Sequence, residues 1–418
     1  MDVGPLRSGI PRHASRRVPA GGDLGHLVPP EPLAESGWPG APGSATGGGR
    51  ALPYEDRLLR VERWPDCRRT RGRRLCHQRC RGAEGGDHGS RLPRRTLSCE
   101  DGHMTSPGSP FVRLVVLNWN SGDLLARCLD SLAGLDWPPD RLETVVVDNA
   151  STDGSVVDLQ RHRPEVRLLC NDRNTGFGAN NLAMADLDGV DLVGLVNPDV
   201  VVDGGWLAAL AAVMGADAGL GAACPRILLG DGTGPRMIQN AGSELSADGN
   251  SRDRGYLEPD GERYDTPVDV DAWCGAAVLL RADYLRHVGL FEERLFLYYE
   301  DTDLSWRGSN RGWRYRYVPD AECWHLHGAS TGLTGDLVRY YQARNRLLVA
   351  TRNAPVRDVL RAWLRAVGGT VAALRPRRMG LSATGRLRAV GGALRQLPWA
   401  ITTRRSVRAP IPRDARGG

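Results

Sequence analysis

The sequence predicts an α/β protein in which a doubly wound, mostly parallel sheet is followed by C-terminal helices. Continuous apolar runs of strand length recur between residues 112 and 224, which is typical of strands buried on both faces of a parallel sheet. Segments with apolar residues at helical spacing separate these runs. With 418 residues, of which 41% are hydrophobic and 25% charged, the chain can form a large globular core.

Strands and helices are expected to alternate here, joined by right-handed connections. The expected strands are residues 112–117, 143–147, 166–170, 192–196, 220–224 and 278–280. The expected helices are residues 124–135, 153–161, 178–187, 205–214 and 336–352, the second with Asp153 as its capping residue. Residues 230–268 are polar and rich in Gly and Asp, which favours loops and short strands.

Charge divides the chain into three segments, with net charges of +6 over residues 1–103, −12 over residues 104–354 and +12 over residues 355–418. Residues 1–103 are rich in Gly, Pro and Arg without periodicity. We expect them to be a disordered extension, or upstream sequence that precedes a natural start at Met104. The acidic middle segment would repel phosphate, so nucleic acid is not expected as a partner.

Residues 355–418, the basic C-terminal segment, are expected to contain amphipathic helices. Apolar residues recur at helical spacing at positions 356, 359, 360, 363, 364 and 367, while Arg357, Arg361 and Arg365 share another face. A basic amphipathic helix that includes Trp is typical of helices lying on anionic membranes. Residues 387–401 predict a second, weaker helix, and packing against the rest of the protein is the alternative. No apolar run is long enough to span a bilayer, so we expect a cytoplasmic protein peripherally bound to the inner face of the plasma membrane.

Polar residues follow each of the first four predicted strands, where a parallel sheet binds its ligands. Asp148, after the second strand, can accept the imide N–H of a uracil or thymine ring. Asp199, after the fourth strand, can hold a hard divalent cation against a diphosphate. No Gly-x-Gly-x-x-Gly or Walker loop is present, which argues against dinucleotide and P-loop chemistry.

A second acidic cluster contains Glu300, Asp301 and Asp303. Three carboxylates so close in sequence repel one another unless a cation, a proton or solvent compensates. Their apolar flanks favour a partly enclosed site over the alternative of a solvated turn. Further along, His325 and His327 offer imidazoles suited to metal ligation.

Taken together, these motifs resemble glycosyltransferase family 2, and within it the bacterial rhamnosyltransferase-like and galactofuranosyltransferase-like members. The resemblance covers about residues 112–352 and is carried by residues 115–120, 148–154, 174–178, 197–199 and 300–304. It implies a GT-A fold with a Rossmann-like nucleotide-sugar domain. It also implies inverting transfer of a rhamnose-like or galactofuranose-like sugar from a dTDP- or UDP-linked donor. The implied acceptor is a hydroxyl of a cell-envelope glycan or a lipid-linked sugar.

The resemblance also implies roles for single residues. Nucleotide-sugar binding would fall to Asn118, Asn120, Asp148, Asn149, Asn174, Gly176 and Asn180. A divalent metal, Mg²⁺ or Mn²⁺, would be held by Asp199 and His325, with His327 as an alternative because it stands where Gly is common. The catalytic pair would be Asp301, as the base, and Glu300. The acceptor would be bound by Trp273, Gly275 and Asp303.

Two other functions compete with this interpretation. A nucleotidyltransferase on a similar sheet would need a Gly-rich basic phosphate loop after the first strand, and residues 118–122 lack one. A non-enzymatic, Arg-rich protein that binds membranes or nucleic acid would leave the acids at the strand ends unexplained.

Overall fold

The structure, a computed structural model, describes residues 108–326, 335–373 and 383–408. The predicted N-terminal segment, residues 1–103, and the candidate ligand His327 lie outside the described residues.

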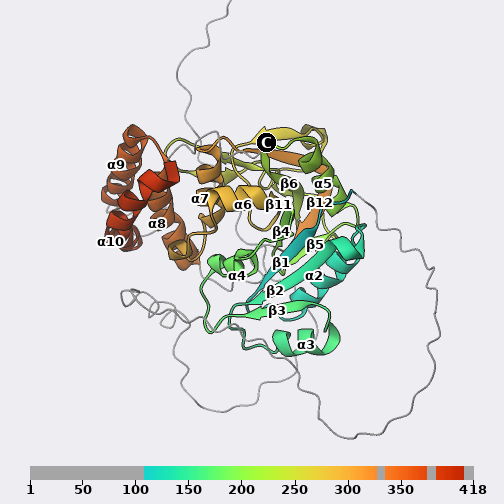
Figure 1. The fold of residues 1–418 in the computed structure, drawn as a ribbon. Coiled ribbons are helices and arrows are strands. Elements are labelled where there is room, and N and C mark those ends of the chain that lie inside the picture. The colour runs from blue at the N-terminus through green and yellow to red at the C-terminus, as the bar shows by residue number, and fades with distance from the viewer. Residues whose placement is uncertain (1–107, 327–334, 374–382, 409–418) are drawn as a thin grey trace, which may run out of the picture. The chain divides into compact units, whose positions relative to one another are not determined.

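Parallel strands form one half of the main sheet (Figure 1). They are β1 (Val112–Asn118), β2 (Leu142–Asp148), β3 (Arg167–Cys170) and β4 (Leu192–Val196), in the spatial order β3-β2-β1-β4. The predicted bounds of these strands differ from the observed ones by no more than one residue at each end. The register pairs Asn118 with Asp148, so the polar ends of β1 and β2 lie side by side.

The other half of the sheet is mixed. β11 (Ala277–Arg281) lies antiparallel between β4 and β6 (Leu220–Leu229), and β12 (Arg314–His325) runs parallel to β6. The remaining strands are shorter: β10 (Val268–Val270) and β5 (Val200–Val202) pair with β12, β7 (Ile238–Asn240) pairs with β6, and β8 (Ser243–Leu245) pairs with β9 (Ser251–Asp253). The α/β sheet followed by helices is confirmed, and β12 is a strand that the sequence did not predict.

Alternate residues of the central strands pack into two apolar layers, one on each face of the sheet. On one face Leu114 and Val116 pack with α2 (Asp123–Ala133) and α5 (Trp206–Ala216). On the other face Val115 packs with α4 (Asn181–Met184) and α6 (Ala282–Val288). Such burial on both sides is the reason that the strand sequences are continuously apolar.

Two helix starts differ from the prediction by two residues or more. α3 (Ser155–His162) begins after Gly154, which has a φ of 90° and occupies the capping position expected for Asp153. Asp153 still stabilises the start of α3, because its Oδ1 accepts the N–H of Ser155 at 3.1 Å. The helix expected at residues 178–187 is a 3₁₀ turn, Phe177–Asn180, followed by the short α4.

Helices dominate the C-terminal part of the described chain (Figure 1). α7 (Glu300–Ser309) carries the acidic cluster, and α8 (Gly335–Asn353), α9 (Val356–Ala372) and α10 (Ala383–Arg408) follow β12. These last three helices share one apolar cluster, which buries Leu347, Leu348, Ala362, Ala393 and Ala400. The domain boundary expected at residue 354 therefore falls between helices that pack together.

Candidate active site

β1 and β2 end in a buried polar pair. Nδ2 of Asn118 donates to Oδ1 of Asp148 at 3.0 Å, and Oδ2 of Asp148 accepts the N–H of Ser151 at 3.1 Å. Oδ1 of Asn118 is buried and has no hydrogen-bond partner among the described residues. Because buried polar atoms are normally paired, this oxygen needs a donor that a ligand N–H or O–H group can supply.

Asn149 organises the loop that follows β3. Its Nδ2 donates to Oδ1 of Asn174 at 2.9 Å and to the carbonyl of Gly176 at 3.1 Å. Its Oδ1 accepts the N–H of Thr175 at 3.0 Å, and Asn174 accepts the N–H of Gly176 at 2.8 Å. Asn149 and Asn174 are therefore joined to each other next to the ends of β2 and β3, and they shape the backbone of this loop.

Asn120 and Asn180 occupy different surroundings. Asn120 is exposed with a φ of 53°, and its Oδ1 accepts the N–H of Thr152 at 2.7 Å. Asn180 is buried, and its Nδ2 donates to the carbonyl of Phe177 at 2.9 Å. Asn120 thus lies at the exposed rim of the strand ends, whereas the amide of Asn180 stabilises the 3₁₀ turn.

Gly176 brings the loop after β3 against the segment that precedes α7. Its φ is 73°, and a Cβ at this position would lie 1.8 Å from the carbonyl oxygen of Phe296. The N–H of Phe177 donates to the same carbonyl at 2.8 Å. Glycine is required here both for the left-handed backbone and for the close approach.

The segment before α7 has an unusual backbone. Phe296, Tyr298 and Tyr299 have φ values of 66°, 66° and 75°. Such conformations cost about 1–3 kcal/mol each and persist only where neighbouring groups enforce them. Asn345 on α8 does so, because its Nδ2 lies 2.7–3.0 Å from three carbonyl oxygens, those of residues 295, 297 and 298.

Asp301 lies in the first turn of α7 and is half-buried. Its Oδ2 accepts the N–H of Gly275 at 3.0 Å, and its Oδ1 accepts the N–H of Thr302 at 2.6 Å. Burial raises the pKa of Asp301 above its ordinary value, although these hydrogen bonds oppose the shift. A carboxylate that is oriented by backbone donors and partly desolvated is suited to accept a proton.

Glu300 differs from its neighbour in exposure. Its side chain is buried, and its Oε1 has no hydrogen-bond partner among the described residues. Burial, and after it the charge of Asp301, raises the pKa of Glu300 to about 8. At neutral pH Glu300 therefore holds a proton, and Asp301, oriented by two backbone N–H groups, is the candidate base of the pair.

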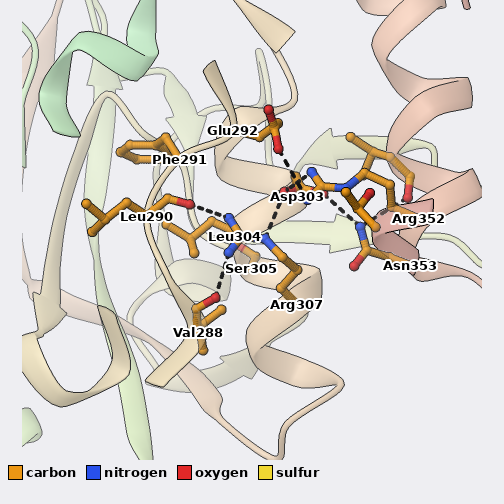
Figure 2. A network of polar contacts seen from close by, with 12 residues as sticks. Val288, Leu290, Phe291, Glu292, Asp303, Leu304, Ser305, Arg307, Arg352 and Asn353 are labelled. Atoms are coloured by element: carbon orange, nitrogen blue, oxygen red, sulfur yellow. Dashed lines mark hydrogen bonds and ion pairs between the residues drawn. The ribbon is translucent and has the colours of Figure 1, made fainter. Parts of the chain in front are cut away.

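Asp303 points into a buried ionic cluster instead of the open side of the site (Figure 2). Its Oδ2 accepts from Arg307 and Arg352, each at 2.8 Å, and its Oδ1 accepts from Asn353 at 2.9 Å. Although burial opposes ionisation, the two guanidinium groups hold the pKa of Asp303 below its usual value. With 0% exposure, Asp303 does not reach an acceptor, and it joins α7 to α8.

The other two predicted acceptor residues, Trp273 and Gly275, lie in different surroundings. Trp273 is 1% exposed and packs edge-on against Phe291 in the core, so it offers no face to a sugar. Gly275 lies beside Asp301, and a Cβ there would come within 2.9 Å of the ring of Phe177. Of the predicted acceptor residues, Gly275 alone contacts the carboxylate of Asp301.

Asp199, shortly after β4, and His325, the last residue of β12, form a buried pair. Nε2 of His325 lies 3.0 Å from Oδ1 of Asp199, and Nδ1 lies 2.6 Å from Oε1 of Gln239. Because an amide oxygen only accepts, Nδ1 donates to Gln239, and this contact turns Nε2 toward the carboxylate of Asp199. Adjacent ligands of an octahedral ion with bonds of about 2.1 Å lie about 3.0 Å apart, so this pair fits such an ion.

The sequence did not single out three residues in or beside this region: Gln239, Asp253 and Asn345. Gln239 and Asp253 lie in residues 230–268, where many similar polar side chains conceal individual ones. Asn345 lies in a predicted helix between Arg344 and Arg346, and nothing in the sequence sets this amide apart from other polar helix residues. Gln239 orients His325, and Asn345 holds the segment before α7.

The mixed sheet, the polar strand ends and the oriented carboxylate define the GT-A class of nucleotide-sugar transferases. A family model described as glycosyltransferase like family 2 matches residues 107–346. The chain belongs to this family and is an inverting, nucleotide-sugar-dependent glycosyltransferase. The nucleotidyltransferase and the non-enzymatic alternatives are therefore not supported.

Two curated relatives come from Mycobacterium tuberculosis. N-acetylglucosaminyl-diphospho-decaprenol L-rhamnosyltransferase is 31% identical over 238 residues, which are 52% of this chain and 77% of the relative. Pre-mycofactocin glycosyltransferase is 29% identical over 254 residues, which are 56% of this chain and 47% of the relative.

Solved structures of glycosyltransferases resemble the chain more distantly. GalNAc-T7 with UDP, GalNAc and Mn²⁺ has a TM-score of 0.49 and 16% identity, covering 71% of this chain and 58% of that one. S. aureus TarS with UDP-GlcNAc has a TM-score of 0.46 and 17% identity, covering 71% and 90%. The family assignment rests on the family model and the mycobacterial relative.

Proposed function

We propose that this enzyme transfers a rhamnose-like or galactofuranose-like sugar from a dTDP- or UDP-linked donor to a hydroxyl group of a lipid-linked or cell-envelope glycan. The observation that carries the proposal is the carboxylate of Asp301, which the N–H groups of Gly275 and Thr302 orient in the first turn of α7. The choice of sugar and acceptor is supported by the relative named as a rhamnosyltransferase of N-acetylglucosaminyl-diphospho-decaprenol.

The donor would bind across the ends of β1, β2 and β3. Asn118 and Asp148 would receive the base, since Oδ1 of Asn118 has no partner among the described residues and Asp148 keeps unused lone pairs. Asn120, at the rim, and the loop shaped by Asn149 and Asn174 would follow the ribose and the diphosphate. Asn180 would act on the donor indirectly, through the 3₁₀ turn that it stabilises.

Asp199 and His325 would hold a divalent cation, Mg²⁺ or Mn²⁺. Among the described residues no set of three or more His, Cys, Asp or Glu side chains is arranged around one metal position. The protein would thus provide two ligands and leave the remaining positions to the diphosphate and water. When bound, the cation neutralises negative charge that develops on the departing diphosphate.

The residues of this chain would act on the acceptor as follows. Asp301 accepts the proton of the acceptor hydroxyl as that oxygen attacks the anomeric carbon from the face opposite the diphosphate. Attack from the opposite face inverts the anomeric configuration. Glu300 keeps its own proton at neutral pH, so it does not compete as the base.

The donor and the reaction can be tested together on the full chain. We expect it to release nucleoside diphosphate from dTDP-rhamnose or UDP-galactofuranose when an alkyl-diphospho-N-acetylglucosamine is present with Mn²⁺. UDP-glucose and GDP-mannose are the matched controls, and they should be used at least about tenfold more slowly because small pocket differences discriminate to this extent. Equal use of all four donors would contradict the proposed sugar class.

We also place the enzyme at the inner face of the plasma membrane, through α9. The inner side of α9 packs within the helical unit, where Trp363 donates to the hydroxyl of Thr351 at 3.0 Å. Its outer side leaves an apolar stripe exposed: Val356, Leu360, Leu364, Val367 and Val371, which are 51–71% exposed. No helix among the described residues is long and apolar enough to cross a membrane.

Charge supports the same orientation of α9. Arg357, Arg361 and Arg365 have side chains that are 65–78% exposed and flank the stripe, where Arg357 and Arg361 pair with Asp358 and Arg365 pairs with Asp248. An unpaired arginine near an anionic bilayer contributes about 1 kcal/mol of attraction, and these acidic partners reduce that contribution. The apolar stripe and the arginines would therefore bind the headgroup region together and bring the site close to a lipid-linked acceptor.

A further inference from the structure

Asp253, the last residue of β9, lies close to the site but has no part in the mechanism above. Its strand partner is Ser243, whose N–H donates to the carbonyl of Ala272 at 2.9 Å. Ala272 is followed within three residues by Gly275, the donor to Asp301. The hairpin of β8 and β9 is therefore joined through a short stretch of backbone to the segment that orients the base.

The two oxygens of Asp253 have different surroundings. Oδ1 accepts from Nδ2 of Asn240 at 2.6 Å and lies 3.5 Å from the hydroxyl of Ser243. Among the described residues no donor contacts Oδ2. Asn240 therefore fixes the orientation of the carboxyl group and leaves one oxygen available to a ligand.

Contacts on two sides place Asp253 near both halves of the site, because Asn240, which donates to Asp253, directly follows Gln239, the partner of His325, and Ser243 links Asp253 to the segment of Gly275. Burial raises the pKa of Asp253 to about 6, while the hydrogen bond from Asn240 opposes that rise. Beyond these two effects, the charge of Asp301 raises the pKa further and His325 lowers it. Asp253 thus lies within electrostatic range of the base and of the predicted metal ligand.

Neither the predicted metal site nor the base Asp301 requires Asp253. A third metal ligand would form a set of three acidic or imidazole side chains, and the described residues contain no such set. The base is already oriented by Gly275 and Thr302. An acceptor sugar, however, carries several hydroxyl groups, and the attacking one is selected only if another part of the ring is held.

We infer that Oδ2 of Asp253 accepts a hydrogen bond from a second hydroxyl group of the acceptor sugar, and that Asp253 thereby determines which hydroxyl is glycosylated. The inference rests on the proposed transferase function and adds a specificity-determining residue to it. A hydrogen bond between a hydroxyl and a half-buried carboxylate that Asn240 orients is strong enough for this selection.

The test is Asp253→Asn in the full chain, since Asn keeps an oxygen for Asn240 and replaces the other oxygen by an N–H₂ group. The probe is the best substrate from a panel of octyl glycosides and octyl-diphospho glycosides, together with its singly deoxygenated analogues. We expect kcat/KM for this acceptor to fall about 10- to 100-fold. Hydrolysis of the donor by water, and nucleoside diphosphate affinity with Mn²⁺, should stay unchanged.

The deoxygenated acceptors make the test specific. The analogue that lacks the hydroxyl held by Asp253 should be a poor substrate for the unaltered enzyme. Asp253→Asn should use this analogue as well as the unaltered enzyme does. Glu244→Gln is the matched control, because it removes a half-exposed carboxylate paired with Arg252 on the same hairpin. It should change none of these quantities.

Two results would overturn the inference. In one, Asp253→Asn lowers donor hydrolysis as much as transfer, which would assign Asp253 to the donor or metal side. In the other, acceptor kinetics do not change. Failure of the proposed function would look different, because the unaltered chain would then release no nucleoside diphosphate from any nucleotide-sugar.

Discussion

The carbonyl of Phe296 accepts the N–H of Phe177 at 2.8 Å, and this contact joins the loop after β3 to the segment that leads into α7. The first loop belongs to the strand ends, where the donor is expected, and the second positions Asp301. This backbone contact therefore links the loop expected to bind the donor to the segment that Asn345 holds and that leads to Asp301. Gly176 makes it possible, because only a residue without Cβ can approach Phe296 so closely.

Gly176→Ala should damage both loops. The added Cβ meets a carbonyl oxygen, and the left-handed backbone disfavours alanine, so we expect a loss of about 2–4 kcal/mol in unfolding free energy. Donor affinity, measured by calorimetric titration with the nucleotide-sugar, should fall with it. Gly205→Ala is the control, since a Cβ there meets no atom within 4 Å. Wild-type stability and affinity in Gly176→Ala would show that the contact does not constrain the loops.

Gln239→Leu should weaken metal binding without removing a metal ligand. Without the amide oxygen the His325 ring loses the partner that fixes its tautomer and orientation. Loss of such a partner typically costs about 10- to 100-fold in metal affinity. Mn²⁺ binding followed by electron paramagnetic resonance measures this effect, with the exposed Gln160→Leu on α3 as control.

Chelator provides the complementary experiment. Activity should disappear in excess EDTA and return with Mg²⁺ or Mn²⁺. Full activity of the unaltered enzyme in chelator would contradict a metal role for Asp199 and His325.

Glu300 should make the folded state less stable as pH rises. Its pKa is about 8 in the folded protein and near 4.5 when unfolded, so between these values the folded state holds the proton that the unfolded state releases. The stability that this proton contributes is therefore fully present below about pH 4.5 and is lost as pH rises to about 8, by on the order of 3 kcal/mol between pH 5 and 8.

Glu300→Gln should flatten that part of the curve and raise the melting temperature at pH 8. Denaturant unfolding at several pH values measures it, and the exposed Glu262→Gln is the control. The same slope in Glu300→Gln and in the unaltered protein would assign the pH dependence to other groups.

Leu360→Glu combined with Leu364→Glu should release the enzyme from anionic membranes. Both side chains lie on the exposed stripe, at 60% and 71% exposure, so the fold should be retained. Deletion of residues 355–418 is a weaker test, because it would remove Ala393 and Ala400 from a buried cluster.

Sedimentation with phosphatidylglycerol vesicles measures this release. We expect at least about a tenfold loss of binding, since two buried apolar side chains become two repelled charges. Val157→Glu, at a 54% exposed position on α3, should bind as the unaltered enzyme does. Unaltered protein that does not sediment with these vesicles would contradict the membrane role of α9.

The strands of the parallel half could be predicted because burial on both faces demands continuous apolar sequence. β12 could not, because Pro319 and Asp320 interrupt it. The structure accommodates them in a register shift between Val318 and Glu322, and such a bulge has no clear sequence signal.

The strand-end residues could be predicted because residues at the carboxyl ends of parallel strands converge at one edge of the sheet. Asp301 and Asp303 could not be told apart in the same way. On a helix they face different directions, Asp301 toward Gly275 and Asp303 toward Arg352. Without knowledge that α7 begins at Glu300, residue spacing alone offers three equivalent acids, and only the family resemblance distinguished their roles.

The most direct measurement is the anomeric configuration of the first-formed product, followed by NMR in the unaltered enzyme and in Asp301→Asn. We predict a product inverted relative to the donor, and a loss of turnover of at least about 100-fold in Asp301→Asn, because the proton acceptor is gone. Donor affinity should be unchanged in that variant. A product that retains the donor configuration, or normal turnover by Asp301→Asn, would contradict in-line attack with Asp301 as the base.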